Sequence, residues 1–272
     1  MTVRFGAYED VTDLTPLNPF DRSGDGRPRV PDDLLERMKL VTIEEAWRVL
    51  SNHGYDYQFE GNWVNLHPDR VMVGRAITAT MVPLRPDLND VVNAQGESEG
   101  RHGSQNNWVI QTVAEKDVVV VNLFGKVKQG TFVGDNLSTA VHGQGGAGLV
   151  IDGGIRDTAG VNELPDINVF CRGFHPTPIR NLTLISLNGP TRIGQATVLP
   201  GDVVLGTLGG LIFIPPHLVE EVVETSEDIR LRDKFGKQRL REGKYTSGQI
   251  DVRIWEEHIE TDFQEWLKAR QI

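Results

Sequence analysis

The chain has 272 residues, 39% of them hydrophobic, and is therefore long enough to bury a full core in one large domain or two small ones. Its net charge of −10 argues against a large nucleic-acid interface, which needs an excess of basic residues, and no stretch approaches the ~20 apolar residues of a membrane helix. A single cysteine excludes an internal disulfide, and the first residues lack the apolar run of a signal peptide, so we expect a cytoplasmic protein without nucleic-acid or membrane partners.

The first part of the chain predicts an arm followed by helices. Residues 1–30 mix Pro and Gly with polar residues and are expected to form an irregular arm. Residues 31–54 begin with a proline and end with a glycine, which is typical of a helical segment. Thr42 and Glu45 have the spacing of a capping box, which indicates two short helices within this segment. Residues 85–106 are polar and contain glycine, and we expect an inserted loop or lid there.

The rest of the chain is dominated by expected strands. Residues 71–84 alternate and are β-branched, and 117–125 form the continuous apolar run of a buried strand. Further strands are expected at 147–154, 167–173, 182–188, 192–198 and 202–215. Helices are expected at 107–116, 136–144, 215–242 and 255–268. This order predicts an α/β protein whose central mixed sheet or partial β-barrel is flanked by helices.

A glycine-rich segment has the spacing of a dinucleotide-binding fingerprint, Gly143-x-Gly145-x-x-Gly148. Such a fingerprint requires a strand, then the glycine turn, then a helix whose N-terminus meets the pyrophosphate. Here an expected helix precedes the glycines and an expected strand follows them. We therefore interpret the segment as a turn that leads from the helix into the strand.

Three charged residues stand at two expected junctions between strands and helices. Asp135 opens a helix, whereas Arg156 and Asp157 follow a strand that ends in two glycines. Ligands of α/β proteins bind at such junctions, and two carboxylates with water would suit Mg²⁺, which prefers oxygen ligands. The alternative is that both aspartates cap helices and that Arg156 pairs with one of them. The residues alone leave both interpretations open.

The spacing Asp135-x20-Arg156-Asp157 resembles the signature of the family that joins RraA-type regulators of ribonuclease E activity to class II 4-hydroxy-4-methyl-2-oxoglutarate/4-carboxy-4-hydroxy-2-oxoadipate aldolases. The blocks that agree, in order, are VGRAITAT (73–80), DVVVVN (117–122), GAGLVIDGGIRD (146–157), VFCRGFHPTP (169–178) and LPGDVVLGTLGGLIFIPPHLVEEV (199–222). The resemblance implies an RraA-like fold of the swivelling β/β/α type. It also implies a homotrimer or homohexamer with sites between subunits.

The resemblance implies a division of the chain and roles for its residues. The catalytic domain would cover 31–245, between the N-terminal arm and a C-terminal helical extension over 246–272. Mg²⁺ or Mn²⁺ would lie near Asp157, and Asp135 would orient a metal-bound water. Arg156 and the main-chain amides of two residues after Asp135 would hold the pyruvate part of the substrate; these two residues are Asn136 and Leu137.

Three further residues enter through shorter local similarity. Asn107 and Gln111 would contact the substrate, and Gln111 stands where such enzymes can have His. Glu45 would reach the site of a neighbouring subunit. One departure concerns the acid that the aldolase motif places three residues after the second aspartate, because this chain has Gly160 there.

The expected activity is that of a divalent-metal-dependent carbon–carbon lyase acting on a 2-oxo acid. It would cleave a 4-hydroxy-2-oxo acid by a retro-aldol reaction or decarboxylate oxaloacetate, and both reactions produce a pyruvate enolate. One alternative is a non-catalytic RraA-type regulator that binds a protein such as an endoribonuclease. Another is a sugar-acid lyase or dehydratase that uses the same metal site. We expect Cys171 to be a core residue and His175 to be structural.

Overall fold

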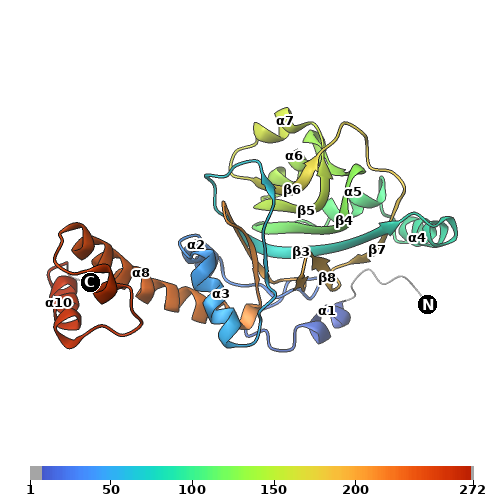
Figure 1. The fold of residues 1–272 in the computed structure, drawn as a ribbon. Coiled ribbons are helices and arrows are strands. Elements are labelled where there is room, and N and C mark those ends of the chain that lie inside the picture. Colours follow the sequence, from blue (N-terminus) through green and yellow to red (C-terminus); the bar gives the residue numbers. More distant parts are fainter. Residues whose placement is uncertain (1–7, 271–272) are drawn as a thin grey trace. The chain divides into compact units, whose positions relative to one another are not determined.

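The computed structural model describes residues 8–270, and Figure 1 shows its fold. Two compact units divide the chain, Met1–Val222 and Val223–Ile272. The division falls inside helix α8 (Val219–Arg241), earlier than the boundary that the sequence suggested at residue 245. Each unit has a hydrophobic core of its own.

The first unit is built on a nine-stranded mixed sheet. The strand order is β1-β11-β10-β3-β4-β5-β6-β2, and β7 pairs with β3. Strands β3, β4, β5 and β6 run parallel, whereas the remaining pairs in the sheet are antiparallel. The strands are β1 (Phe59–Glu60), β2 (Val64–Asn65), β3 (Met72–Pro83), β4 (Asp117–Val133), β5 (Gly148–Ile155), β6 (Asn168–Phe174), β7 (Leu182–Leu187), β10 (Val203–Thr207) and β11 (Gly210–Ile214). The α/β class and the central mixed sheet are therefore as expected.

The sheet curls without closing into a barrel. Strands β1 and β2 come from one short segment, residues 59–65, yet β1 pairs with β11 and β2 pairs with β6 at the opposite edge. Among the described residues, β1 and β2 form no ladder with each other. The segment thus bridges the two edges of a partial barrel.

Two expected strands are hairpins. The strand expected at 192–198 is the hairpin of β8 (Thr191–Ile193) and β9 (Ala196–Val198), which turns at Gly194 with a φ of 57°. The strand expected at 202–215 is divided into β10 and β11 by a turn at residues 208–209. In both cases a two-residue turn divides the expected strand, and at Gly194 glycine adopts the left-handed conformation without steric cost.

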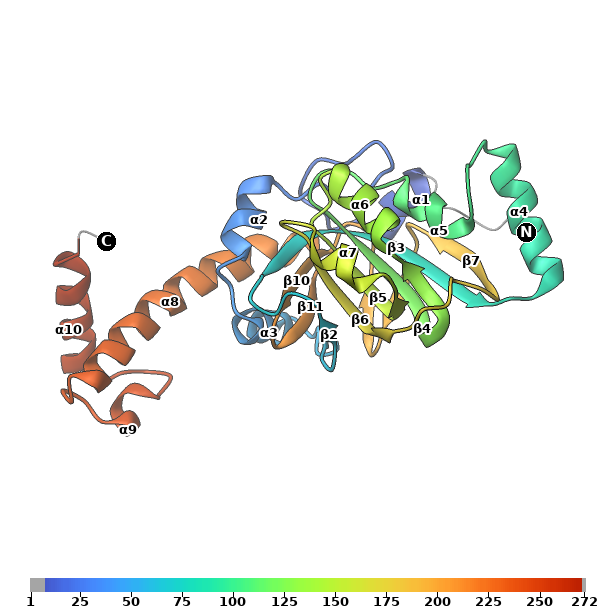
Figure 2. The same cartoon turned by 90° about the horizontal axis from the view of Figure 1, so that it is seen from above.

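Helices cover the face of the sheet on which Val119, Val121 and Ile151 lie. Helices α5 (Gln105–Ile110) and α6 (Asp135–Gly143) pack there with α7 (Thr158–Asn162), as Figures 1 and 2 show together. The opposite face packs against β8 and β9. Because both faces are covered, the four valines at 118–121 of β4 are fully buried, which explains the continuous apolar run in the sequence.

The N-terminal helices agree with the capping signal in the sequence. Residues 31–54 form α2 (Asp32–Met38) and α3 (Ile43–Asn52). The Thr42 hydroxyl accepts the Glu45 N–H at 3.2 Å, and the Glu45 carboxylate accepts the Thr42 N–H at 2.9 Å. The expected arm over 1–30 lies partly outside the described residues, and its described part contains helix α1 (Tyr8–Leu14).

The prediction of a loop over 85–106 is wrong for most of that segment. Residues Pro86–Ser98 form helix α4, in which Val92 is buried and Gly96 lies against the ring of Trp108. Only a narrow stripe of this helix faces the core, so its polar sequence resembles that of a loop. The helix expected at 107–116 is also displaced, because α5 ends six residues earlier, at Ile110.

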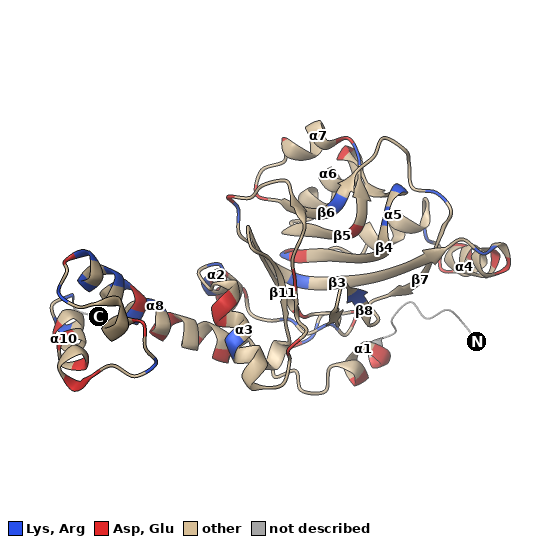
Figure 3. Ribbon diagram, viewed as in Figure 1, with Lys and Arg blue, Asp and Glu red and all other residues tan. Residues whose placement is uncertain are grey.

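The second unit is helical. It contains most of α8 together with α9 (Ser247–Ile250) and α10 (Glu257–Lys268). Its core is mainly aromatic and contains Phe235, Trp255, Ile259, Phe263 and Trp266. The first half of α8 is acidic and its second half mostly basic, whereas α10 is mainly acidic (Figure 3), and charged residues of the two helices pair, such as Arg239 with Asp262 at 2.7 Å. In the described part of the chain, we find no helix with the length and apolar character needed to cross a bilayer.

Candidate functional site

The two junctions that carry the charged residues are neighbours. Strand β4 ends at Val133 and strand β5 at Ile155, and these two residues pair in the parallel ladder. The Arg156 N–H donates to the Val133 carbonyl at 3.1 Å, which extends the ladder by one residue. Helix α6 begins at Asp135, directly after this edge. The structure therefore brings Asp135, Arg156 and Asp157 to one edge of the sheet.

The side chains of Arg156 and Asp157 lie together and remain accessible. Nη1 of Arg156 is 3.3 Å from Oδ2 of Asp157, and about 40% of each side chain is exposed. The Asp157 carboxylate lies directly against Gly134, where a β-carbon would collide with Oδ2. A glycine before α6 is thus required for the carboxylate to reach the end of β4.

The backbone at Asp157 is in the left-handed region, with φ 52° and ψ 41°. Residues other than glycine adopt this region at an energetic cost, and such conformations cluster at functional sites. Asp157 precedes α7, but its side chain makes no capping hydrogen bond. The capping interpretation therefore does not account for Asp157, whereas the pairing of Arg156 with an aspartate is observed.

Asp135 lies between the first turn of α6 and helix α7. Its Oδ1 accepts the N–H of Asn136 at 2.7 Å. On the other side it lies against Gly160, where a β-carbon would be only 2.8 Å from the β-carbon of Asp135. The glycine that replaces the expected acid is thus the residue that allows α7 to lie against Asp135.

The first turn of α6 supplies the amides that the resemblance implied. Asn136 is exposed and Leu137 is partly buried. The first N–H groups of a helix have no partner within the helix, and together with the helix dipole they attract anions. These amides lie at the same edge of the sheet as Arg156, so a substrate carboxylate could meet both groups.

The side chains of the other expected contact residues, Asn107, Gln111 and Glu45, make local hydrogen bonds. The Asn107 amide donates to Ser104 Oγ at 2.8 Å, and the Gln111 amide donates to the His102 carbonyl at 3.1 Å. The Glu45 carboxylate caps α3. Contact with a neighbouring subunit is a prediction that a single chain does not test.

The structure adds two residues that the sequence did not indicate as functional. Gln105 and Asn106, in the first turn of α5, are buried, and the Asn106 amide donates to the Phe132 carbonyl at 2.8 Å. Phe132 precedes Asp135 by three residues. Buried polar groups need hydrogen-bond partners. The two amide residues directly before the apolar run of α5 were the feature of the sequence that could have indicated these positions.

Cys171 and His175 were expected to have structural roles, and their environments can be described. Cys171 is fully buried, and burial raises the pKa of its thiol to about 11. His175 follows β6, and its Nδ1 accepts the Thr177 N–H at 3.2 Å and lies 2.9 Å from the Thr177 hydroxyl. The expectation that Cys171 belongs to the core is confirmed.

The carboxylates fit a hydrated hard cation better than a closed metal centre. Within residues 8–270 there is no group of three or more His, Cys, Asp or Glu side chains arranged to hold a metal. Mg²⁺ often binds through one or two carboxylates and keeps several waters, which leaves positions for a substrate. Asp157, half exposed and not used as a cap, has the donor chemistry for such a cation, with Asp135 beside it.

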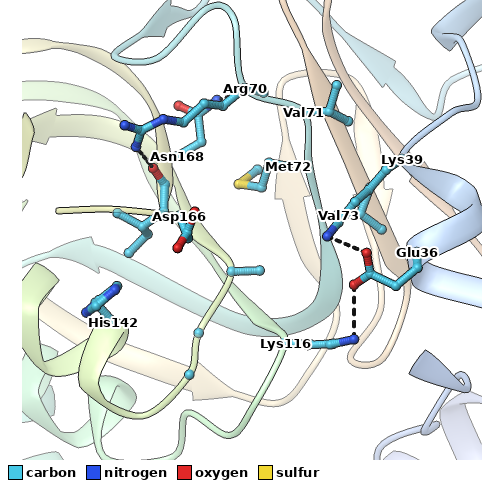
Figure 4. A pocket seen from close by; sticks show the side chains of 14 residues that line it. Glu36, Lys39, Arg70, Val71, Met72, Val73, Lys116, His142, Asp166 and Asn168 are labelled. Carbon is cyan, nitrogen blue, oxygen red and sulfur yellow. Dashed lines mark hydrogen bonds and ion pairs between the residues drawn. The ribbon is translucent and has the colours of Figure 1, made fainter. Parts of the chain in front are cut away.

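A cavity of about 490 Å³ lies elsewhere, at the edge where the parallel strands begin (Figure 4). Glu36 there accepts hydrogen bonds from Lys39 at 2.7 Å and Lys116 at 3.1 Å, so both ammonium groups already have a partner. Because β4 and β5 end at the opposite edge of the sheet, this cavity is separate from Asp135 and Asp157.

Comparison with known proteins agrees with the fold. The RraA-like model, described as Aldolase/RraA, matches residues 33–213. The chain belongs to the Aldolase/RraA family. The RraA-like chain is 26% identical over 166 residues to an uncharacterized protein of Methanocaldococcus jannaschii, covering 59% of this chain and 79% of that protein.

Relatives of this RraA-like chain carry two kinds of name. A protein of Halalkalibacterium halodurans named "Putative 4-hydroxy-4-methyl-2-oxoglutarate aldolase" is 27% identical over 167 residues, which is 60% of this chain and 78% of that protein. The crystal structure of Streptomyces coelicolor RraAS2, described as an unusual member of the RNase ES inhibitor RraA protein family, has a TM-score of 0.66 and 26% identity. The match covers 78% of this chain and 100% of the RraAS2 chain.

Proposed function

We propose that this RraA-like protein is a divalent-metal-dependent lyase that acts on 2-oxo acids. The observation that supports the proposal is the meeting of Asp135, Arg156 and Asp157 at neighbouring strand ends, beside the backbone amides at the start of α6. The aldolase name of a relative is consistent with this assignment.

Each side chain has a chemical role in the proposed reaction. Asp157, with Asp135 beside it, would hold Mg²⁺ or Mn²⁺, which when bound supplies Lewis-acid polarisation of the 2-oxo group. The Arg156 guanidinium would stabilise the negative charge that develops on the enolate oxygen. The amides of Asn136 and Leu137 would bind the substrate carboxylate. Asp135 would accept and return a proton through a water molecule.

The retro-aldol step balances with these groups. A water molecule held by Asp135 takes the proton of the 4-hydroxyl, and the C3–C4 bond breaks as the 4-carbon becomes a carbonyl. The bonding electrons form the enolate of pyruvate, which Arg156 stabilises until C3 accepts a proton. In oxaloacetate the same C3–C4 bond breaks, carbon dioxide leaves and the same enolate forms. One site therefore serves both substrates.

The test is a screen for pyruvate formation from 4-hydroxy-2-oxo acids and oxaloacetate with Mg²⁺, with Mn²⁺ and with a chelator. We expect metal-dependent pyruvate release that Asp157→Asn and Arg156→Ala each reduce by at least about a hundredfold, as removal of one charge-stabilising group does elsewhere. Asp166→Asn is the matched control, because Asp166 is also an exposed aspartate with a left-handed backbone, at φ 55°, but lies away from this edge. Unchanged activity in both site variants would refute the site assignment.

A second candidate is a regulator of the RraA type, favoured by the similarity to RraAS2 and by Gly160 in place of the expected acid. No pyruvate from any acid in the screen, together with no metal binding and with inhibition of an endoribonuclease, would favour this candidate. Turnover of a sugar acid instead of a 2-oxo acid would favour the lyase or dehydratase alternative on the same residues.

A further inference from the structure

A small cavity of about 190 Å³ lies between helices α4 and α5 and the residues that lead into β7. We call it the amide cavity. Its lining consists of Met81, Asn93, Ser104, Gln105, Asn106, Ile179, Arg180 and Leu182. Helices α4 and α5 form one wall, and the residues that lead into β7 form the other.

The amide cavity opens at the same edge of the sheet as Asp135. Met81 lies near the end of β3, which runs parallel to β4. The Asn106 amide donates to the carbonyl of Phe132, next to the last residue of β4. Arg180 is attached to the same strand, because its N–H donates to the Gln129 carbonyl at 2.9 Å. The wall residues are thus tied to the strand that leads into Asp135.

The orientation of the amides is fixed by their partners. Gln105 accepts the Leu184 N–H at 2.6 Å, so its other end is the NH₂ group, which donates to Asn93 Oδ1 at 2.9 Å. Asn93 must therefore keep its own NH₂ group for another partner. Asn106 likewise directs its nitrogen toward a carbonyl at Phe132 and retains a second N–H. Hydrogen-bond donors, rather than free acceptors, remain on this wall.

The charge in the lining of the amide cavity also favours an anionic ligand. Arg180 is the one ionisable residue in the lining of the amide cavity, and among residues 8–270 it forms no ion pair. A guanidinium has donors only and recognises carboxylates through paired N–H groups. The apolar part of the lining, Met81, Ile179 and Leu182, suits the carbon chain of a small acid rather than a fully hydrated inorganic ion.

We propose that the amide cavity binds a carboxylate group of a small organic acid, with Arg180 as counter-charge and with Asn93 and Asn106 as additional donors. The helix that replaces the expected loop over 85–106 is what builds this wall. The consequence for turnover rests on the proposed function: the carboxylate bound here would be the second one, on the C4 side of the bond that breaks, whereas the α6 amides hold the carboxylate of the pyruvate part.

The first experiment measures binding alone, by calorimetric titration of the full chain with succinate. We expect saturable binding, weakened about tenfold or more by Arg180→Gln, because a charge-assisted pair is lost. Asn93→Asp should weaken it at least as much, since the carboxylate keeps the acceptor for Gln105 but replaces the donor with a like charge. Arg85→Gln is the matched control, because exposed Arg85 at the start of α4 loses the same charge outside the cavity.

Several results would overturn the proposal. These are succinate binding that is equal in wild type, Arg180→Gln and Asn93→Asp; equal binding of the neutral analogue succinamide; tighter binding of inorganic phosphate than of succinate; or no succinate binding at all. Circular dichroism and thermal unfolding of each variant exclude loss of fold as the cause. Arg180→Lys keeps the charge without the paired donors and should show intermediate affinity.

The second experiment separates this proposal from the proposed function. In the pyruvate assay, Arg180→Gln should raise KM about tenfold for a 4-hydroxy-2-oxo acid with a second carboxylate, and leave KM for one without it unchanged. Succinate binding that depends on Arg180, without turnover of any acid, would support the amide cavity and reject the lyase. Turnover that is indifferent to Arg180 for both substrates would support the lyase and reject the amide cavity as a subsite.

Discussion

Asp157 illustrates how one residue combines a conformational demand with a chemical one. Its left-handed backbone turns the chain from β5 into α7, and its carboxylate occupies the space that Gly134 leaves open. Asn and Asp tolerate this conformation better than other residues except glycine. The sequence Gly-Ile-Arg-Asp therefore places a charged group where a plain turn would have used glycine.

Gly160 is the residue at which this chain departs from the aldolase pattern, and it gives a prediction. Gly160→Asp should lower pyruvate release by about tenfold instead of improving it, and should cost about 1–3 kcal/mol of stability, because overpacking displaces Asp135. Steady-state kinetics and urea unfolding measure the two effects. Gly143→Ala is the control, since a β-carbon there meets nothing within 4 Å. An increase in activity would contradict the prediction and would show that α7 can move away from Asp135 to accommodate the larger side chain.

Asp202 predicts a pH dependence of folding. Burial raises the pKa of Asp202 to about 7. The Leu199 N–H donates to Oδ2 at 2.8 Å and partly offsets this rise. The native state therefore holds this proton where the unfolded state, with the ordinary pKa of 3.8, has lost it. The stabilisation is complete below about pH 4 and is lost as the pH rises through 7, by up to about 4 kcal/mol.

The measurement for Asp202 is urea unfolding at pH 5 and pH 7.5. Asp202→Asn retains an acceptor for the Leu199 N–H and should reduce the loss of stability between these two pH values. An identical pH dependence in wild type and Asp202→Asn would mean that other groups cause it; buried Asp117, whose pKa burial also raises, is the first to examine.

At the scale of elements, the capping box of α3 and the proposed role of Glu45 can be separated. Thr42→Ala removes the cap and should cost about 1 kcal/mol of stability with little effect on turnover. Glu45→Gln retains the box, since Gln serves at this position, but removes the charge. We expect it to leave the unfolding midpoint unchanged and to lower activity if Glu45 reaches a neighbouring subunit. Equal activity of both variants and wild type would restrict Glu45 to capping.

At the scale of the whole molecule, we expect the chain to form an oligomer. The proposed site is open on one side, with about 40% of the Arg156 and Asp157 side chains exposed, and Glu45 lies outside it. We expect a homotrimer or homohexamer in solution, in which a neighbouring chain covers this edge. Light scattering coupled to size-exclusion chromatography should give three or six chain masses. A monomer with full pyruvate-forming activity would contradict this expectation.

The sequence by itself determined much of the core and the position of the three charged residues along the chain. The valines of β4 predicted a strand buried on both faces, and Thr42 with Glu45 predicted the start of α3, because periodicity and capping are local properties. Local order also decided that Gly143, Gly145 and Gly148 form a turn: α6 ends at the first and β5 begins at the third.

Only the tertiary structure decided which groups meet. The contact of Gly160 with Asp135, the amide network around Gln105 and the link of Arg180 to Gln129 join residues that are far apart in the chain, and no local pattern encodes such distances. Helix α4 was missed for the same reason, since the few core contacts of this helix, through Leu88, Val92 and Gly96, are made with residues outside its own segment. Local propensity determines which elements form, whereas packing across the sheet determines which side chains share a site.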